Sequence, residues 1–429
     1  MTPGGRLSAA IEILDEVLSR HRPAGEAARD WGRAHRFAGS GDRTAITNLV
    51  NAALRRRQSI AWTMDAETPR ALALGALKLS WGLSSEEIAG IADGSGFAPQ
   101  PLSEDERAVL GVEDRLAEAP DWVVGDYPEW LAPAFSAAFS NRAVEEGRGL
   151  AGRAPLDLRV NTLKSDRQQV LKALSRYKAK ETKYAPNGLR IALGEGPERI
   201  PNVESHALHG RGRFEVQDEG SQIAAELAGA KAGMQVVDYC AGAGGKTLAL
   251  AASMRNKGQI HAHDASERRL RPIFERLRRS GARNVQVRTG SDPLTDLQSR
   301  ADLVFVDAPC TGSGVWRRRP DAKWRLRQPM LDQRISEQVE ILGQSAQLVR
   351  SGGLLVYVTC SVLPAENDQQ IDRFLAINQD FGVVAWKEVW AATLGTTRPE
   401  SASTGDQLLQ LTPARHATDG FFVAILKRH

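Results

Sequence analysis

The feature that most constrains the fold is a regular alternation of strand-like and helix-like segments after residue 220. Short apolar runs bounded by polar and turn residues are typical of strands. The candidate strands are Gln235–Asp238, Gln259–His263, Val285–Arg288, Asp302–Asp307 and Leu354–Thr359. Helical stretches separate most of these runs, notably 266–280 and 331–350. This βαβ order predicts an α/β fold with a doubly wound, mostly parallel sheet.

The rest of the chain has a different character. Residues 6–90 place apolar side chains at helical spacing, and the Gly-, Pro- and acid-rich text between about 91 and 128 indicates a loop or linker. Three strand-like runs follow within 155–216, with the sequences LDLRVNTLK, GLRIAL and RFEVQ. At 429 residues, two or three domains are expected. We expect an all-helical domain at 1–135, a small α+β segment at 136–225 and the α/β domain at 226–429.

Composition narrows the class of protein. No apolar run is long enough to span a bilayer, and the first residues lack a secretory pattern, so a cytoplasmic protein is expected. Three cysteines without a CxxC pair argue against a disulfide framework and against a zinc site. Residues 1–130 carry 14 Lys+Arg against 20 Asp+Glu, whereas the remaining chain carries 42 against 32. A basic C-terminal part suits a polyanionic partner.

All three cysteines follow candidate strands. Cys240 comes two residues after the first strand, Cys310 three residues after the fourth, and Cys360 directly after the fifth. Ligands of doubly wound sheets bind beyond the carboxyl ends of the strands. One cysteine at such a place is usually a small buried hydrophobe, but three of three indicate a site.

A glycine-rich turn follows the first strand. Its sequence, from 238 to 247, is DYCAGAGGKT, and its glycines let the backbone approach a ligand at a helix N-terminus. The GGKT ending favours a phosphate-binding P-loop, although that motif requires glycine where the chain has Cys240. The turn alone fits either a nucleotide or S-adenosylmethionine. Asp264, at the end of the second strand, either accepts hydrogen bonds from ribose hydroxyls or stabilises a helix N-terminus.

Two further motifs are more specific. Asp-Ala-Pro-Cys ends the fourth strand at 307–310, and Thr-Cys-Ser ends the fifth at 359–361. Together with GGKT upstream, they resemble the Sun/Fmu family of RNA cytosine-5 methyltransferases. Further resemblance extends from about 155 to the end of the chain, in RVNTLK (159–164), QDEGSQ (217–222), GVWRRRPDAKW (314–324), SVLPAEND (361–368) and DGFF (419–422).

The resemblance implies a Rossmann-like class I methyltransferase domain that uses S-adenosylmethionine. It implies Cys360 as nucleophile, Cys310 as the group that assists its release, and Asp307 and Lys246 as groups that contact the cytosine ring. The implied cofactor residues are Cys240, Ala241, Gly242, Ala243, Gly244, Gly245, Lys246, Asp264, Asp292 and Asp307, and no metal site is implied. Ala243 stands where the family commonly has proline, a change that keeps the turn flexible.

The chemistry explains why such a family needs a cysteine. Carbon 5 of cytosine is a poor nucleophile, and a thiolate that adds to carbon 6 turns the ring into an enamine that can attack a methyl group. DNA cytosine methyltransferases use the cysteine of a Pro-Cys motif, which would select Cys310. The RNA family uses the cysteine after threonine, and because this chain has that motif we assign Cys360.

The N-terminal helices resemble the NusB-like RNA-binding domain of the bacterial RsmB subgroup, through GDRTAITNLVNAALRRRQSIAW at 41–62. That segment contains the cluster Arg55–Arg57. Helix 266–283 carries seven arginines against two glutamates, which we interpret as a solvated face. The basic loop after Cys310, with Trp316 and Trp324 interleaved, we expect to contact RNA.

The favoured partner is 16S ribosomal RNA, because the subgroup acts on small-subunit ribosomal RNA. Transfer RNA is the alternative substrate. A P-loop nucleotidase and a non-catalytic RNA-binding assembly factor are the alternatives from other classes. Nothing in the sequence indicates a membrane or an obligate protein partner.

Overall fold

The computed structural model describes residues 1–289 and 294–429, and the chain forms two compact units within it. The first unit comprises Met1–Ala154, Leu193–Ile200 and Trp316–Leu326. The second comprises Pro155–Ala192, Pro201–Val315 and Arg327–His429. The predicted division into three domains, with boundaries after residues 135 and 225, stays a prediction. None of the helices in the described ranges is long and apolar enough to cross a membrane.

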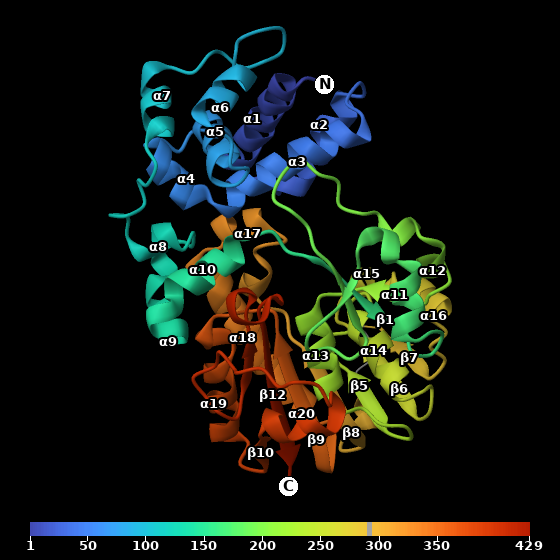
Figure 1. Ribbon diagram of the computed structural model, residues 1–429. Helices are drawn as coiled ribbons and strands as arrows, with labels where there is room; N and C mark the ends of the chain where they lie inside the picture. The colour runs from blue at the N-terminus through green and yellow to red at the C-terminus, as the bar shows by residue number, and fades with distance from the viewer. Residues whose placement is uncertain (290–293) are drawn as a thin grey trace. The chain divides into compact units, whose positions relative to one another are not determined.

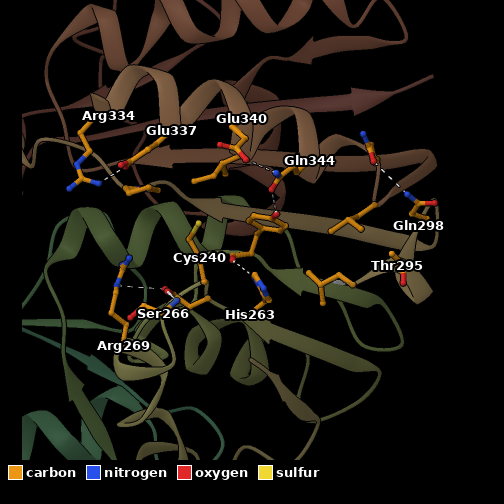
Figure 2. A pocket seen from close by; sticks show the side chains of 18 residues that line it. Cys240, His263, Ser266, Arg269, Thr295, Gln298, Arg334, Glu337, Glu340 and Gln344 are labelled. Carbon is orange, nitrogen blue, oxygen red and sulfur yellow. Dashed lines mark hydrogen bonds and ion pairs between the residues drawn. The ribbon is translucent and has the colours of Figure 1, made fainter. Parts of the chain in front are cut away.

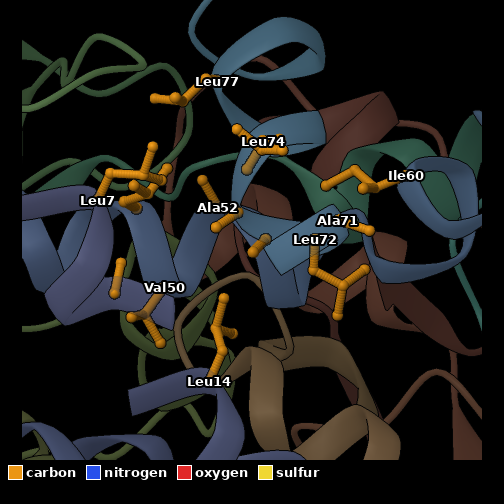
Figure 3. Packing of buried hydrophobic residues seen from close by; sticks show 14 of the residues in the cluster. Leu7, Leu14, Val50, Ala52, Ile60, Ala71, Leu72, Leu74 and Leu77 are labelled. Carbon is orange, nitrogen blue, oxygen red and sulfur yellow. The ribbon is translucent and has the colours of Figure 1, made fainter. Parts of the chain in front are cut away.

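The first unit is all-helical (Figure 1). Its helices are α1 (Pro3–Ser19), α2 (Ala24–Ala34), α3 (Ser40–Arg55), α4 (Arg57–Met64), α5 (Pro69–Leu79), α6 (Ser85–Ile91), α7 (Glu104–Gly111), α8 (Asp121–Val124), α9 (Ala132–Phe139), α10 (Ala143–Ala151) and α17 (Pro320–Arg325), with 3-10 turns η1 (Glu129–Leu131) and η2 (Ser140–Arg142). Figure 3 shows its core, in which Leu7, Leu14 and Val50 pack with Leu72 and Leu74. The apolar spacing predicted helices over 6–90, and the structure has them there.

The expectation of a linker over 91–128 is wrong in part. Helix α7 lies inside it and begins with a capping box: the Ser103 hydroxyl accepts from the Glu106 N–H at 3.1 Å, and the Glu106 carboxylate accepts from the Ser103 N–H at 3.0 Å. The sequence SEDE at 103–106 is therefore a helix start, because each residue satisfies a backbone donor that would otherwise lack a partner.

The second unit contains two sheets. The smaller is antiparallel in the order β2-β3-β1-β4, and the larger has the order β10-β12-β9-β8-β5-β6-β7, with β11 paired to β12. The strands are β1 (Leu156–Val160), β2 (Lys180–Glu181), β3 (Gly188–Ile191), β4 (Phe214–Val216), β5 (Gln235–Asp238), β6 (Gln259–His263), β7 (Val285–Arg288), β8 (Ala301–Asp307), β9 (Val349–Thr359), β10 (Phe381–Val384), β11 (Leu409–Leu411) and β12 (Phe421–Arg428). The helices are α11 (Arg167–Ala173), α12 (Ala207–Gly210), α13 (Glu219–Leu227), α14 (Gly245–Ser253), α15 (Glu267–Leu270), α16 (Ile273–Ser280), α18 (Gln328–Ala346), α19 (Asp368–Ile377), α20 (Trp386–Thr393) and α21 (Pro413–His416), with 3-10 turns η3 (Ser175–Tyr177), η4 (Val203–Ser205), η5 (Thr295–Leu297), η6 (Ser313–Val315) and η7 (Pro364–Glu366).

The larger sheet is a doubly wound Rossmann-like sheet. Strands β5, β6, β7, β8 and β9 are parallel, and β12 runs antiparallel between β9 and β10. The chain order reverses at β5, since β6 and β7 lie to one side of it and β8 and β9 to the other. Ligands of such sheets bind at this reversal, beyond the carboxyl ends of the strands. The predicted α/β fold class is confirmed.

A buried polar layer joins the smaller sheet to the helices of the larger one. The Arg190 guanidinium pairs with Asp157 at 2.7 Å and with Glu219 at 3.3 Å. Glu215, which is 3% exposed, pairs with Arg276 at 2.9 Å and with Arg279 at 2.7 Å. Breaking a buried pair by removing one partner is costly because it leaves an uncompensated charge, so these pairs fix the smaller sheet against α13 and α16.

Candidate active site

Two of the three cysteines meet where neighbouring strands end. Strands β8 and β9 are parallel and adjacent, and the loops that follow them carry Cys310 and Cys360. Their sulfur atoms lie 3.4 Å apart, and neither cysteine forms a disulfide. Cys240, which follows the neighbouring strand β5, lines a cavity instead. The three cysteines thus lie at one edge of the sheet, as the sequence predicts, but only two form a pair.

The environments of the two thiols differ. The contact with Cys360, together with burial and the nearby Glu366 carboxylate, raises the pKa of Cys310 well above its usual value. A thiol that holds its proton can donate it to a neighbouring sulfur, so Cys310 can act as a donor in its S–H···S contact with Cys360.

A buried ion pair lies beside the cysteines. The Lys246 ammonium, on the first turn of α14, lies 2.6 Å from the Asp307 carboxylate at the end of β8. Burial alone would lower the pKa of Lys246, but the charges of Asp307 and Cys360 outweigh burial and raise it, so the lysine stays protonated. The ammonium also lies over the Phe421 ring, 5.2 Å from its centroid. The site therefore offers a fixed cation beside a carboxylate that is about one third exposed.

Glu366, which the sequence analysis did not single out, holds both cysteine loops. Its carboxylate is completely buried and accepts from the Thr311 N–H at 2.8 Å and the Thr311 hydroxyl at 2.6 Å. It also accepts from the Ser361 hydroxyl at 2.5 Å and the Gln338 amide at 3.1 Å. Thr311 follows Cys310 and Ser361 follows Cys360, so one carboxylate fixes the residue after each cysteine. The only sequence signal was its place in SVLPAEND.

Backbone contacts tighten the same junction. The Gly314 N–H donates to the Cys360 carbonyl at 2.9 Å, and the Ser313 hydroxyl lies 2.9 Å from that of Ser361. A Cβ on Gly314 would lie 2.2 Å from the Gly420 carbonyl oxygen. This close approach requires glycine, and it packs the Cys310 loop against the DGFF segment.

The glycine-rich turn connects β5 to α14, which begins at Gly245, so the predicted residues Ala241, Gly242, Ala243 and Gly244 form the turn itself. Gly242 and Gly244 have φ of 50° and 83°, values that favour glycine. The Thr247 hydroxyl donates to Asp238 at 2.6 Å, and burial raises the pKa of Asp238 to about 7. In a P-loop this hydroxyl would face a metal ion, so its use inside the fold argues against the nucleotidase.

A cavity of about 720 Å³ opens beside this turn (Figure 2). Its walls come from the loops after β5 and β6 and from α18, and they include Tyr239, Cys240, His263, Asp264 and Ser266. The Asp264 carboxylate accepts from the Gly242 N–H at 3.0 Å and from the Ser266 N–H at 2.9 Å. It thus holds the turn and lines the cavity. A carboxylate acceptor beside the Tyr239 ring and the apolar Ile341 of α18 suits an adenosine, so S-adenosylmethionine fits the residues present. Asp292, also expected at the cofactor, lies outside the described residues.

The expectation that the loop after Cys310 presents its tryptophans to RNA is wrong. The segment Trp316–Leu326 belongs to the first unit. Trp316 is 1% exposed and stacks near Phe135, with centroids 6.1 Å apart, and the Trp324 indole N–H donates to the Leu54 carbonyl. Both rings are used in packing, because an aromatic side chain between cations serves a protein core as well as an RNA surface.

The cluster Arg55–Arg57 is also used internally. The Arg55 guanidinium donates to the Arg317 carbonyl at 2.9 Å, and burial lowers its pKa to about 10. Arg56 donates to the Leu79 carbonyl, and Arg57 pairs with Glu67 at 2.5 Å. The cluster therefore fixes α3 and α4 within the first unit.

Comparison with known proteins agrees with this geometry. Residues 226–427 match the model of the family described as 16S rRNA methyltransferase RsmB/F, and residues 127–194 match the ferredoxin-like domain of RsmF/B-like methyltransferases. The chain is 33% identical over 311 residues to a probable ribosomal RNA small subunit methyltransferase B from Synechocystis, an alignment that covers 70% of this chain and 67% of that protein. It is 31% identical over 316 residues to the corresponding probable enzyme of Bacillus subtilis, covering 70% and 66%.

Solved structures show the same fold. The crystal structure of PH0851 aligns with all of this chain and 99% of its own at a TM-score of 0.73 and 24% identity. A methyltransferase homologue from Pyrococcus horikoshii aligns with 72% of this chain and 98% of its own at a TM-score of 0.60 and 26% identity. The sheet order, glycine turn and strand-end cavity thus define a class I S-adenosylmethionine-dependent methyltransferase, and the predicted cofactor is confirmed. Within this class the chain belongs to the RsmB/F family, which confirms the resemblance found in the sequence.

Proposed function

We propose that this protein methylates carbon 5 of a cytosine in RNA, with 16S ribosomal RNA as the favoured substrate and Cys360 as the nucleophile. The observation that carries the proposal is the Cys310–Cys360 pair, with sulfurs 3.4 Å apart next to the Lys246–Asp307 ion pair. The curated relatives named above are described as acting on small-subunit ribosomal RNA, and the chain spans about two thirds of their length.

The geometry supports a covalent route. S-adenosylmethionine, when bound, supplies an electrophilic methyl group. The Cys360 thiolate adds its electron pair to carbon 6, and the former carbon 5–carbon 6 double bond provides the pair that takes the methyl group. In this route Asp307 hydrogen-bonds the ring and Lys246 stabilises charge on its carbonyl oxygen. A base then removes the carbon 5 proton, the double bond re-forms, and the carbon 6–sulfur bond breaks to return the thiolate.

The second cysteine assists the last step. Cys310 holds its proton and lies in contact with the Cys360 sulfur, so it can stabilise that sulfur as it leaves carbon 6. Cys310→Ala should still permit attack and methyl transfer, but it should stall before elimination. Cys360→Ala should prevent the covalent link altogether.

The test uses purified enzyme, labelled S-adenosylmethionine and an unmodified 16S RNA transcript. Cys310→Ala is expected to give a denaturation-resistant protein–RNA band that RNase shifts, and Cys360→Ala is expected to give neither band nor methylation. Cys240→Ala is the matched control, since it removes a thiol without removing either member of the pair, and it should give no trapped band. The reverse pattern for the first two variants would make Cys310 the nucleophile. Unchanged activity in both would exclude the covalent mechanism.

The substrate is tested by mapping 5-methylcytosine in 16S RNA and in transfer RNA incubated with the enzyme. Modification of one cytosine in the 16S transcript supports the proposal, and modification of transfer RNA alone favours the alternative substrate. An enzyme that binds either RNA but transfers no methyl group would be the non-catalytic assembly factor.

A further inference from the structure

The two arginine-rich segments of the chain differ in where their aromatic side chains lie. The segment after Cys310 buries Trp316, Arg317 and Lys323. Helices α15 and α16, in contrast, expose a face of the second unit. The exposed helix face agrees with the solvated face that the sequence predicts, whereas the tryptophans of the loop are packed inside the first unit.

Within the part of the chain that the structure describes, three of the seven arginines in 266–283 form ion pairs. Arg276 and Arg279 pair with the buried Glu215, and Arg269 lies 3.7 Å from Asp264. On the inward side, Leu270 and Ile273 are 2% and 0% exposed. These contacts fix the orientation of both helices, so the outward side chains are presented on a rigid element.

The outward face combines cations with an aromatic ring. Arg268, Arg271 and Arg278 are exposed, and within the described residues their side chains have no ion pair. Phe274 is 60% exposed and lies four residues before Arg278 on α16, so the two share one face of the helix. Arg268 lies on α15 and Arg271 directly follows that helix, three residues before Phe274. We call Arg268, Arg271, Phe274 and Arg278 together the α16 face.

The α16 face begins at the rim of the cofactor cavity. Ser266 and Arg269, labelled in Figure 2, line that cavity, and α15 starts between them at Glu267. A strand of RNA bound on this face would therefore extend from the place where the methyl donor is expected.

We propose that the α16 face binds single-stranded RNA, with Phe274 stacking on a base and Arg268, Arg271 and Arg278 contacting phosphates. RNA is the partner that fits both parts of the face: phosphates match the arginines, and an unstacked base matches a flat exposed ring. An acidic protein segment would use the arginines but would give no role to the ring. The proposal rests on the proposed function, since it concerns how the same RNA is held.

Equilibrium binding of an unmodified 16S transcript, measured by filter binding at several salt concentrations, tests the proposal. Phe274→Ala is expected to weaken binding roughly ten-fold, the effect of losing about one stacked base. Arg271→Gln with Arg278→Gln should lower the slope of log affinity against log salt by about 1.4, since each single-strand phosphate contact contributes about 0.7.

Helix α19 offers a matched control. Arg373 and Ile377 are exposed there at the same four-residue spacing, and Ile377 is 78% exposed. Arg373→Gln with Ile377→Ala removes one exposed cation and one exposed apolar side chain elsewhere, so RNA affinity and its salt slope should stay unchanged. Calorimetry with S-adenosylmethionine should give wild-type affinity for all these variants, which separates lost RNA binding from misfolding.

The outcomes separate this proposal from the proposed function. If the wild type methylates RNA and the α16 variants bind it as the control does, the α16 face is not an RNA surface. If the wild type transfers no methyl group while the α16 variants alone lose RNA affinity, the methylation proposal fails and the surface stands. Polyglutamate is the probe for an acidic protein segment. If the arginine variants lose polyglutamate binding and Phe274→Ala binds RNA as the wild type does, the face binds an acidic protein and the RNA proposal is overturned.

Discussion

Lys323 gives the sharpest test of how the segment Trp316–Leu326 packs within the first unit. Its side chain is 1% exposed, and its ammonium donates to the backbone carbonyls of Arg55 (2.8 Å) and Asp126 while lying 4.6 Å from the Trp324 ring centroid. Burial lowers its pKa from 10.5 to about 7; the Asp126 carboxylate opposes this shift and the Arg55 guanidinium adds to it. Lys323→Met keeps the length of the side chain and removes the titrating group.

The sign of the pH effect follows from the lowered pKa. Between pH 7 and 10.5 the opened segment binds a proton at Lys323 that the packed segment has lost, so packing strengthens as pH rises. Below about pH 7 both states are protonated, and the packed segment retains the full cost of the buried charge, about 5 kcal/mol at 1.36 kcal/mol per pKa unit. From pH 7 to pH 9 the wild type should gain about 2 kcal/mol relative to Lys323→Met.

Hydrogen exchange of the peptide 316–326, corrected for the intrinsic pH dependence of exchange, measures the free energy of opening. At pH 9 the variant should open more easily than the wild type, because the carbonyls of Arg55 and Asp126 lose a buried donor, at about 1–3 kcal/mol each. At pH 7 the difference should be smaller or reversed. Lys257→Met, at an exposed lysine, is the control and should show no pH-dependent difference. A difference that stays constant from pH 7 to pH 9 would refute the burial of a titrating lysine.

Three further predictions concern the active site. Asp264→Ala should weaken S-adenosylmethionine binding by about 1–3 kcal/mol in calorimetry, because the ribose hydroxyls lose an acceptor, and unchanged affinity would exclude the assignment. Glu366→Gln should reduce kcat roughly 10- to 100-fold, since it disturbs the geometry of both cysteine loops. Cofactor affinity should change little, because Glu366 does not line the cavity. Equal losses of kcat and of cofactor affinity would indicate general unfolding. Gly314→Ala should lower the free energy of unfolding, measured by urea denaturation, by about 1–3 kcal/mol, since its Cβ would lie 2.2 Å from the Gly420 carbonyl oxygen. Gly343→Ala on α18 is the control: a Cβ there meets open space, so this variant should not be destabilised.

The sequence predicted the larger sheet well because its strands are short, buried and separated by turns. The predicted strands at 235–238, 259–263 and 285–288 have the observed bounds. Strand β9 begins earlier than predicted, at Val349, because Ser351 and Gly352 interrupt its apolar pattern without ending the strand. The position of the active site also followed from the predicted sheet, since the carboxyl ends of parallel strands lie at the same edge.

Contacts between distant segments could not be predicted in the same way. Glu366 acts on Thr311, 55 residues away, and no local pattern distinguishes such a carboxylate from a solvated one. The tryptophans of the basic loop after Cys310 were misinterpreted for a related reason: tryptophan between arginines and lysine is typical of an RNA surface and equally of a buried anchor. Burial decides between the two, and burial depends on which distant helices pack against the segment.

The unequal surroundings of the two thiols bear most directly on their proposed roles. A nucleophile must be a thiolate when it attacks, whereas the group that assists elimination must hold a proton. The contact with Cys360, burial and the Glu366 carboxylate all favour the protonated form of Cys310, and the Lys246 ammonium lies close enough to Cys360 for their charges to interact. Exchanging the roles would place the negative charge on Cys310, whose protonated form the Glu366 carboxylate favours, and that is the costlier arrangement in a low-dielectric site. Because the Glu366 carboxylate fixes the residue after each cysteine, Glu366→Gln should reduce the accumulation of trapped adduct in a Cys310→Ala background, since it loosens the loop of Cys360 while leaving Cys360 itself in place.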